Sequence, residues 1–364
     1  MPCSDNVFVS EVLDFSVSVK ILSFVLKIEN SFSDCKLIDS ELLAVNKMNF
    51  FIEHNSIKNK LMNYISAIFK GASKQGDSSF FYIYFPGYVP IIVSLYCLIF
   101  NRPFGLYVRG GWDRSKWYKR VYWKLLFSKA SFILTTGGAF SRLLMPFNNM
   151  VDEVVPMMKF SKNDLEPKYN YEKNTTLNLL FVGRIEKTKG VFVLVEAIQK
   201  IIKENSADVC LMIVGGGDHE DKRALESVIN DNNLSLQIKL MGQIKEPEIL
   251  KKYFKEADIF VFPSYYNEGF PRVLYEAMSF GLPIITTPLD GIVDMLKDNN
   301  NCLYAEKEQS DSLCQQIMKL NEDELLRKRL GIAAFKDIET MMNKNENMSH
   351  AKQVVSFIQN HEKI

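Results

Sequence analysis

The sequence predicts an α/β protein of two domains, each with a parallel sheet covered by helices. Its 364 residues are too many for one ordinary domain and are enough for two, each able to bury its own core. Short apolar runs are followed by glycine-bearing turns and then by helical periodicity, an alternation typical of parallel sheets. The apolar share of 47% and the charged share of 24% are those of a globular chain.

The composition also narrows the classes of partner and the compartment. With a formal net charge of +1, the chain has no overall field that attracts nucleic acid. Its six cysteines are scattered and include no C-x-x-C pair, so neither a zinc site nor a redox dithiol is indicated. A secretory signal has a basic segment followed by an apolar one, and the N-terminus shows no such pattern. We therefore expect a cytoplasmic protein.

The first half of the chain contains an uncharged stretch between Asp77 and Arg102 that is long enough to span a bilayer. Pro86, Gly87 and Pro90 interrupt it, however, and favour a buried strand, a turn and a buried helix. The first fifty residues show no clear pattern. The expected strands are 80–85, 105–108 and 132–135, and the expected helices are 91–100 and 115–127.

The second half repeats the strand, turn and helix pattern more clearly. Its expected strands are 178–182, 209–214, 237–241, 259–262 and 283–287, and a terminal helix is expected over 349–364. Polar residues over 161–175 indicate a connection between domains. The predicted division is 1–165, 166–345 and a C-terminal helix, 346–364, which could return to the first domain. Ligands of such folds bind outside the carboxyl ends of the strands.

The turn after the strand 178–182 carries two cations, Arg184 and Lys189, between Gly183 and Gly190. Helix N-terminal amides favour a phosphate at such a turn, and a guanidinium and an ammonium add charged contacts. A solvated surface loop is the alternative, since Lys and Arg are mostly exposed. After the next strand, the glycines around Gly216 would let backbone approach a ligand, although tight packing explains them equally well. They lack G-x-G-x-x-G spacing, which disfavours a hydride-transferring enzyme.

The segment after the strand 259–262 places a loop carboxylate, Glu268, just before a helix start at Pro271. Proline suits the first helical turn, which leaves the amides of Gly269 and Phe270 to point toward a ligand. Glu276 follows on the same helix, four residues after Arg272. Two carboxylates there can bind sugar hydroxyls; alternatively, Glu276 only pairs with Arg272.

Taken in order, these motifs and Gly281-Leu282-Pro283 resemble the retaining glycosyltransferases of family four, also called group 1. The resemblance covers 178–304. It implies the GT-B architecture, in which two Rossmann-like domains face each other across a central cleft. It also implies that Arg184, Lys189 and Glu268 are catalytic. The implied donor-binding residues are Gly183, Arg184, Lys189, Gly216, Gln243, Ile244, Glu268, Gly269, Phe270 and Glu276.

The first domain departs from the family pattern. The family usually has a glycine-rich turn after its first strand, whereas here no glycine precedes Gly71, and the histidines indicate no site. Arg109, Gly110 and Gly111 are expected to line the acceptor side of the cleft instead. Asp290 stands where the family more often has a glycine, which leaves donor contacts of that loop open.

The resemblance implies a metal-independent hexosyltransferase that retains anomeric configuration, with a nucleotide sugar as substrate and no cofactor. The sequence contains no Asp-x-Asp, so cations must come from side chains and helix ends. The expected pathway is assembly of bacterial surface polysaccharide, such as capsule or lipopolysaccharide, on a glycan or lipid-linked acceptor. The alternatives are a nucleotide-sugar epimerase of similar fold and a catalytically idle scaffold protein.

An aromatic and basic segment precedes the strand 132–135 and contains all three tryptophans with a single acid, Asp113. Such a composition suits a surface of anionic lipid, so peripheral contact with the inner face of the cell membrane is expected. The alternative is a helix that buries its aromatic residues and exposes its charges. The expected contact residues are Trp112, Lys116, Trp117, Lys119, Arg120, Trp123 and Lys124.

Overall fold

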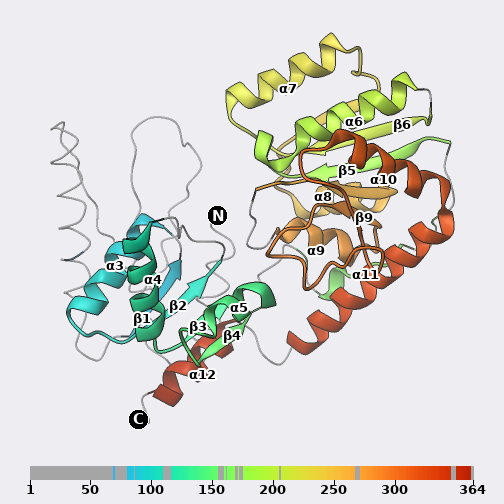
Figure 1. Cartoon of the computed structure of the whole chain (residues 1–364). Helices are drawn as coiled ribbons and strands as arrows, with labels where there is room; N and C mark the ends of the chain where they lie inside the picture. The colour runs from blue at the N-terminus through green and yellow to red at the C-terminus, as the bar shows by residue number, and fades with distance from the viewer. Residues whose placement is uncertain are drawn as a thin grey trace. The chain divides into compact units, whose positions relative to one another are not determined.

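The computed structural model describes residues 69, 80–85, 87–109, 116–154, 160, 162–168, 171, 175–204, 206–266, 271–345 and 350–361. The chain divides into two compact units, each with its own parallel sheet (Figure 1). The first unit comprises 1–135, 144–154 and 348–364, and the second comprises 136–143 and 155–347.

The first unit is built on a four-stranded parallel sheet with the order β1-β2-β3-β4. The strands are β1 (Phe81–Phe85), β2 (Phe104–Val108), β3 (Ile133–Thr135) and β4 (Val151–Glu153). Helix α3 (Tyr88–Ile99) joins β1 to β2, and α4 (Trp117–Lys129) joins β2 to β3. Helix α5 (Gly138–Leu144) precedes β4 in the chain, but most of it belongs to the second unit. The uncharged stretch thus forms a strand and a helix, as predicted. Within the described ranges, no helix is long and apolar enough to cross a membrane.

The two faces of this sheet are covered by different parts of the chain. On one face, the Phe85 ring packs against Trp123 of α4 at a centroid distance of 5.0 Å. On the other face lies α12 (His350–His361), whose Phe357 stacks on Phe132 at 4.8 Å and whose Val354 is buried. The last helix of the chain therefore completes the core of the first unit.

The second unit contains a six-stranded parallel sheet with the order β10-β9-β8-β5-β6-β7. This is the strand order of a Rossmann-like sheet, with β5 as its first strand. The strands β6 and β7 are added on one side of β5, and β8, β9 and β10 are added on the other side. The strands are β5 (Leu177–Val182), β6 (Val209–Val214), β7 (Ile238–Gly242), β8 (Ile259–Phe262), β9 (Ile284–Thr286) and β10 (Leu303–Tyr304). The helices are α6 (Val191–Lys203), α7 (His219–Asp231), α8 (Pro247–Glu256), α9 (Arg272–Ser279), α10 (Ser310–Glu322) and α11 (Glu324–Asn345).

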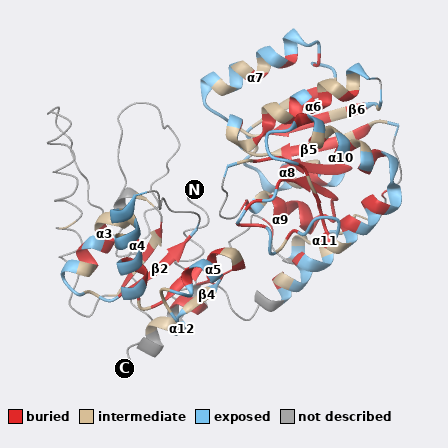
Figure 2. Cartoon of the chain, in the orientation of Figure 1, coloured by how far each residue is buried: buried red, intermediate tan, exposed pale blue. Residues whose placement is uncertain are grey.

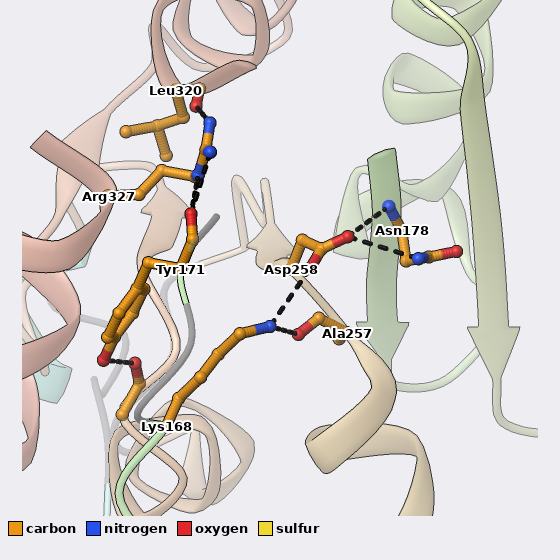
Figure 3. A network of polar contacts seen from close by, with 8 residues as sticks. Lys168, Tyr171, Asn178, Ala257, Asp258, Leu320 and Arg327 are labelled. Carbon is orange, nitrogen blue, oxygen red and sulfur yellow. Dashed lines mark hydrogen bonds and ion pairs between the residues drawn. The ribbon is translucent and has the colours of Figure 1, made fainter. Parts of the chain in front are cut away.

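A polar network fixes the start of the second unit (Figure 3). The Lys168 ammonium donates to Asp258 Oδ1 at 3.1 Å, and Asp258 Oδ2 accepts from the Asn178 amide at 2.9 Å. The Tyr171 hydroxyl donates to Gly281 O at 2.7 Å, and the buried Arg327 guanidinium donates to Tyr171 O at 2.9 Å. Lys168 and Tyr171, which the sequence assigns to an interdomain connection, are thus anchored to the second unit.

Candidate functional site

The loop after β5 carries the two cations predicted to bind the donor. The Arg184 side chain is 70% exposed, and its Nη1 lies 3.9 Å from Oε2 of Glu186. A short 3-10 turn, Lys187–Lys189, follows, in which Lys187 is exposed and Lys189 is half-buried. The loop therefore presents Arg184 and Lys187 to solvent and partly covers Lys189.

The loop after β8 is hydrogen-bonded to this turn. The amides of Tyr265 and Tyr266 donate to Thr188 O at 3.0 and 3.2 Å. The Lys189 ammonium lies 5.4 Å from the centroid of the Tyr266 ring, close enough for a cation–π interaction. Tyr266 is itself 57% exposed. It is a candidate site residue that the sequence reasoning missed, although its place directly after a strand could have indicated it.

Glycines allow the loops at this edge of the sheet to approach closely. Gly190 immediately precedes α6 with φ +74°, and a Cβ at this position would lie only 2.0 Å from Pro263 O in the β8 loop. A Cβ on Gly215, after β6, would lie 1.7 Å from Gly183 O. Tight packing therefore explains Gly215. At Gly216 a Cβ would make only an ordinary contact, 3.5 Å from Oε1 of Gln243, so packing does not explain the glycine at position 216.

The remaining predicted donor residues of these turns lie at the same edge of the sheet. Gln243 and Ile244 follow β7 directly, and the Ile185 amide donates to Gly216 O at 2.8 Å. The structure thus brings one group together just beyond the carboxyl ends of β5, β6 and β7. The group consists of Gly183, Arg184, Lys189, Gly216, Gln243 and Ile244.

Glu276 lies on α9, which begins at Arg272 immediately after Pro271, as predicted. Glu276 is only 5% exposed, whereas Arg272 is exposed. A buried carboxylate requires hydrogen-bond donors or a cation around it, so this position is costly unless it has a structural or binding role. Glu268, Gly269 and Phe270 lie outside the described residues.

The topology of the sheet marks where a ligand should bind. From β5 the chain continues to β6 on one side, and from β8 it continues to β9 on the other. The loops after β5 and β8 therefore diverge, and such a switch point forms the ligand crevice of open α/β sheets. Lys189 and Tyr266 belong to these two loops and contact each other there.

In the first unit, Arg109 follows β2 and is exposed. Its guanidinium carbon lies 5.5 Å from the ring centroid of Tyr84 and 5.7 Å from that of Tyr107. The two rings hold the predicted acceptor-side arginine at the carboxyl end of the sheet. Gly110 and Gly111 lie outside the described residues.

A histidine that the sequence reasoning passed over lies beside these rings. The His350 ring is 4.5 Å from that of Tyr107, and its Nε2 is 2.6 Å from the Tyr82 hydroxyl. Burial, and to a lesser extent the Arg109 charge, lower the pKa of His350 to about 4, so its imidazole is neutral at pH 7. Because 268 residues separate Tyr82 from His350, no local pattern could have indicated the contact.

The aromatic and basic segment forms α4, and the structure corrects one of its predicted contact residues. Trp123 is 8% exposed and packs between Phe85 and Phe127, so it belongs to the core and is not available to a membrane. Trp117 is 76% exposed. Among the basic residues, Lys116, Arg120 and Lys124 are exposed and Lys119 is half-buried. Trp112 lies outside the described residues.

With this geometry established, the chain can be compared with known proteins. Residues 163–337 match the sequence model of the family Glycosyl transferases group 1. The second unit belongs to the group 1 glycosyltransferases. This assignment confirms the resemblance that the motifs carry and places all the predicted donor-binding positions inside the family domain.

Two curated glycosyltransferases are similar in sequence to this chain. The amylovoran biosynthesis glycosyltransferase AmsK of Erwinia amylovora is 32% identical over 174 residues, which are 46% of this chain and 42% of AmsK. The capsular polysaccharide biosynthesis glycosyltransferase CapM of Staphylococcus aureus is 29% identical over 185 residues, or 50% of this chain and 46% of CapM. The matched parts are therefore less than half of either relative.

Solved structures show the same fold over both units. A glycosyltransferase from Rickettsia africae superposes with a TM-score of 0.64 at 17% identity, covering 86% of this chain and 85% of that one. Anabaena HepE in complex with UDP-glucose superposes with a TM-score of 0.61 at 15% identity, covering 85% of each chain. The predicted GT-B fold class, with a parallel sheet in each of two α/β domains, is confirmed.

Proposed function

We propose that the chain is a retaining glycosyltransferase that moves a sugar from a nucleoside diphosphate sugar to a glycan or lipid-linked acceptor. The observation that carries the proposal is the presence of Arg184 and Lys189 on the β5 loop, at the switch point of a group 1 glycosyltransferase domain. Cations at that position suit a diphosphate. The UDP-glucose bound to HepE, which shares the fold, supports a nucleotide-sugar donor.

The proposed roles follow from the placement of each group. Arg184 and Lys189 would stabilise the negative charge that develops on the departing diphosphate, which is electrostatic catalysis. Glu276 would accept hydrogen bonds from the ribose hydroxyls, and Gln243 and Ile244 would lie near the base. Glu268 and the amides of Gly269 and Phe270 would contact the donor sugar. Retention would follow from attack on the same face as the leaving group, with the departing diphosphate assisting removal of the acceptor proton.

The proposed pathway is assembly of a bacterial surface polysaccharide, either capsule or lipopolysaccharide, by a hexosyltransferase on the cytoplasmic side of the membrane. The names of AmsK and CapM, which refer to amylovoran and capsular polysaccharide biosynthesis, support a polysaccharide product. Arg109, held on the Tyr84 and Tyr107 rings, would contact the acceptor from the first unit.

The decisive experiment replaces the cations of the β5 loop one at a time. We expect Arg184→Ala and Lys189→Ala each to lose about tenfold to a thousandfold in catalytic efficiency, because losing one partner of a charged contact costs roughly 2–5 kcal/mol. Binding of UDP, GDP and ADP, measured by calorimetry, should weaken in parallel, while ligand-free melting temperatures stay near the parent's.

Lys187 provides the matched control for these variants. It lies in the same turn and is exposed, so Lys187→Ala should leave catalytic efficiency close to that of the parent. An equal loss of catalytic efficiency in all three variants would mean that the loop acts through its net charge and not through specific contacts of Arg184 and Lys189 with the diphosphate. Parent-like activity of both Arg184→Ala and Lys189→Ala would contradict the proposed function of the site.

A further inference from the structure

Helix α4 exposes an apolar face on the side opposite the core of the first unit. Its buried residues are Trp123, Leu126 and Phe127. The exposed large apolar residues are Trp117 at 76%, Tyr118 at 50%, Val121 at 59% and Leu125 at 46%. At the spacing of an α-helix these four side chains fall within about 100° of arc, centred opposite the buried three. A surface helix normally carries polar residues on its exposed face, so the apolar residues here indicate an interaction surface.

The described residues on and next to α4 are strongly basic. Lys116, Arg120, Lys124 and Lys129 are exposed on or next to the helix. Asp113 is the only acidic residue in the sequence between Asp77 and Asp152. Over the same stretch the cations are Arg102, Arg109, Arg114, Lys116, Lys119, Arg120, Lys124, Lys129 and Arg142. The rest of the chain carries the compensating negative charge, so the net charge of +1 does not reveal this basic stretch.

The neighbouring helix α3 adds apolar surface of its own. The Ser94 hydroxyl of α3 lies 2.6 Å from the Tyr122 hydroxyl of α4, so the two helices pack together. Helix α3 contains no charged residue, and at its end Ile99 is 65% and Phe100 55% exposed. Figure 2 shows exposed stretches on both α3 and α4. Exposed apolar side chains therefore occur on both α3 and α4, the described helices on this face of the sheet.

We propose that α4 docks in the interface of an anionic membrane, with Trp117, Tyr118, Val121 and Leu125 inserted among the lipids. Trp and Tyr favour the membrane interface, and Lys and Arg can extend their stems to place their charges at the phosphates. Among the described residues on and next to α4 the charges have one sign, which matches anionic headgroups. A second copy of the chain is disfavoured, because a two-fold interface would bring the two basic rims together.

This docking surface differs from the contact predicted from the sequence. The sequence predicts contact through the cations and all three tryptophans. The exposed face of α4 keeps Trp117, excludes the buried Trp123 and adds Tyr118, Val121 and Leu125. The inference does not rest on glycosyl transfer, because none of these residues lies in the switch-point site of the second unit. Membrane binding and catalysis can therefore be tested separately.

The test measures partitioning of the full chain onto sedimented vesicles of phosphatidylcholine with and without phosphatidylglycerol. We expect binding to the anionic vesicles only, and weaker binding as salt rises above about 0.1 M. Replacing Trp117, Val121 and Leu125 together by Ser should reduce partitioning at least about tenfold at every salt concentration, because membrane affinity scales with inserted apolar area. Replacing Lys116, Lys119, Arg120 and Lys124 together by Ser should reduce it mainly at low salt.

The matched control removes exposed apolar side chains from the second unit. Leu236 and Leu325 are 84% and 78% exposed, so Leu236→Ser with Leu325→Ser should bind vesicles as the parent does. Melting temperatures and donor turnover in solution verify that each variant is folded. Equal partitioning of the parent and the Trp117, Val121 and Leu125 variant would overturn the proposal. So would a parent that ignores vesicles and forms a dimer, by light scattering, that this variant abolishes.

Discussion

Glu276, a predicted donor-binding residue, lies buried in the second unit. The carboxylate is 5% exposed and sits in the second turn of α9, the helix that follows the β8 loop. Neutral glutamine has nearly the same shape but cannot offer two charged acceptor oxygens. A hydrogen bond to a charged group contributes roughly 1.5–3 kcal/mol, so Glu276→Gln should weaken binding of UDP, GDP or ADP by about tenfold or more.

The control for Glu276→Gln is its thermal stability. If Glu276 binds the ribose, the melting temperature without ligand should stay close to the parent's and calorimetric affinity alone should fall. An unchanged affinity with a lowered melting temperature would instead assign Glu276 to a structural pairing inside α9.

The site residues that sequence reasoning finds are those whose chemistry is local. Arg184 and Lys189 stand within one turn directly after an apolar run, so their position at the edge of a parallel sheet can be predicted. The contact between Lys189 and Tyr266 joins loops after β5 and β8, and the Tyr82 to His350 contact joins opposite ends of the chain. Such pairings depend on how the chain returns on itself, and no spacing rule contains that information.

At the scale of the elements, strands buried on both faces were the most predictable. The expected strands 209–214 and 259–262 have the bounds that the structure gives to β6 and β8. Both are continuous apolar runs ended by turn residues. β4, with the sequence Val-Asp-Glu, is partly exposed, and β10 consists of only two residues. Neither is long or apolar enough to produce a periodic signal, and neither was predicted.

Helix α12 makes the stability of the first unit depend on pH. The pKa of His350 is lowered to about 4, first by burial and then by Arg109, whereas an unfolded histidine titrates near 6.5. Between these values the unfolded chain binds a proton that the folded chain does not, so stability falls as pH falls through this window. The loss is up to about 3 kcal/mol by pH 4, and none is expected above about pH 7.

The comparison of the parent with His350→Gln isolates this contribution. Glutamine can still bond to the Tyr82 hydroxyl but does not titrate, so its unfolding free energy should fall less steeply from pH 6.5 to pH 4.5. All three tryptophans lie between Trp112 and Trp123, so their fluorescence during urea unfolding reports on the first unit. Parallel stability curves for parent and variant would show that His350 is protonated as easily when folded as when unfolded.

At the scale of the whole molecule, the two units carry different predicted binding residues. The second unit supplies Arg184 and Lys189 at its switch point, and the first unit supplies Arg109 and the basic, apolar α4. The donor and the acceptor would thus be bound by different domains, so that each domain can change its specificity without refolding the other. In the proposed function, Arg184 and Lys189 are the residues that stabilise the charge on the leaving diphosphate.

This arrangement predicts catalysis without a metal ion. The sequence contains no Asp-x-Asp that could hold a metal on the diphosphate, and the β5 loop provides a guanidinium and an ammonium in its place. The donor for this test is the nucleotide sugar that raises the melting temperature of the protein most. After exhaustive treatment with EDTA, transfer from this donor should therefore proceed at the rate of the untreated protein. Lys189→Ala should remain equally slow whether or not manganese or magnesium is added. If chelation abolishes transfer and either metal restores it, the metal and not the two cations neutralises the leaving group.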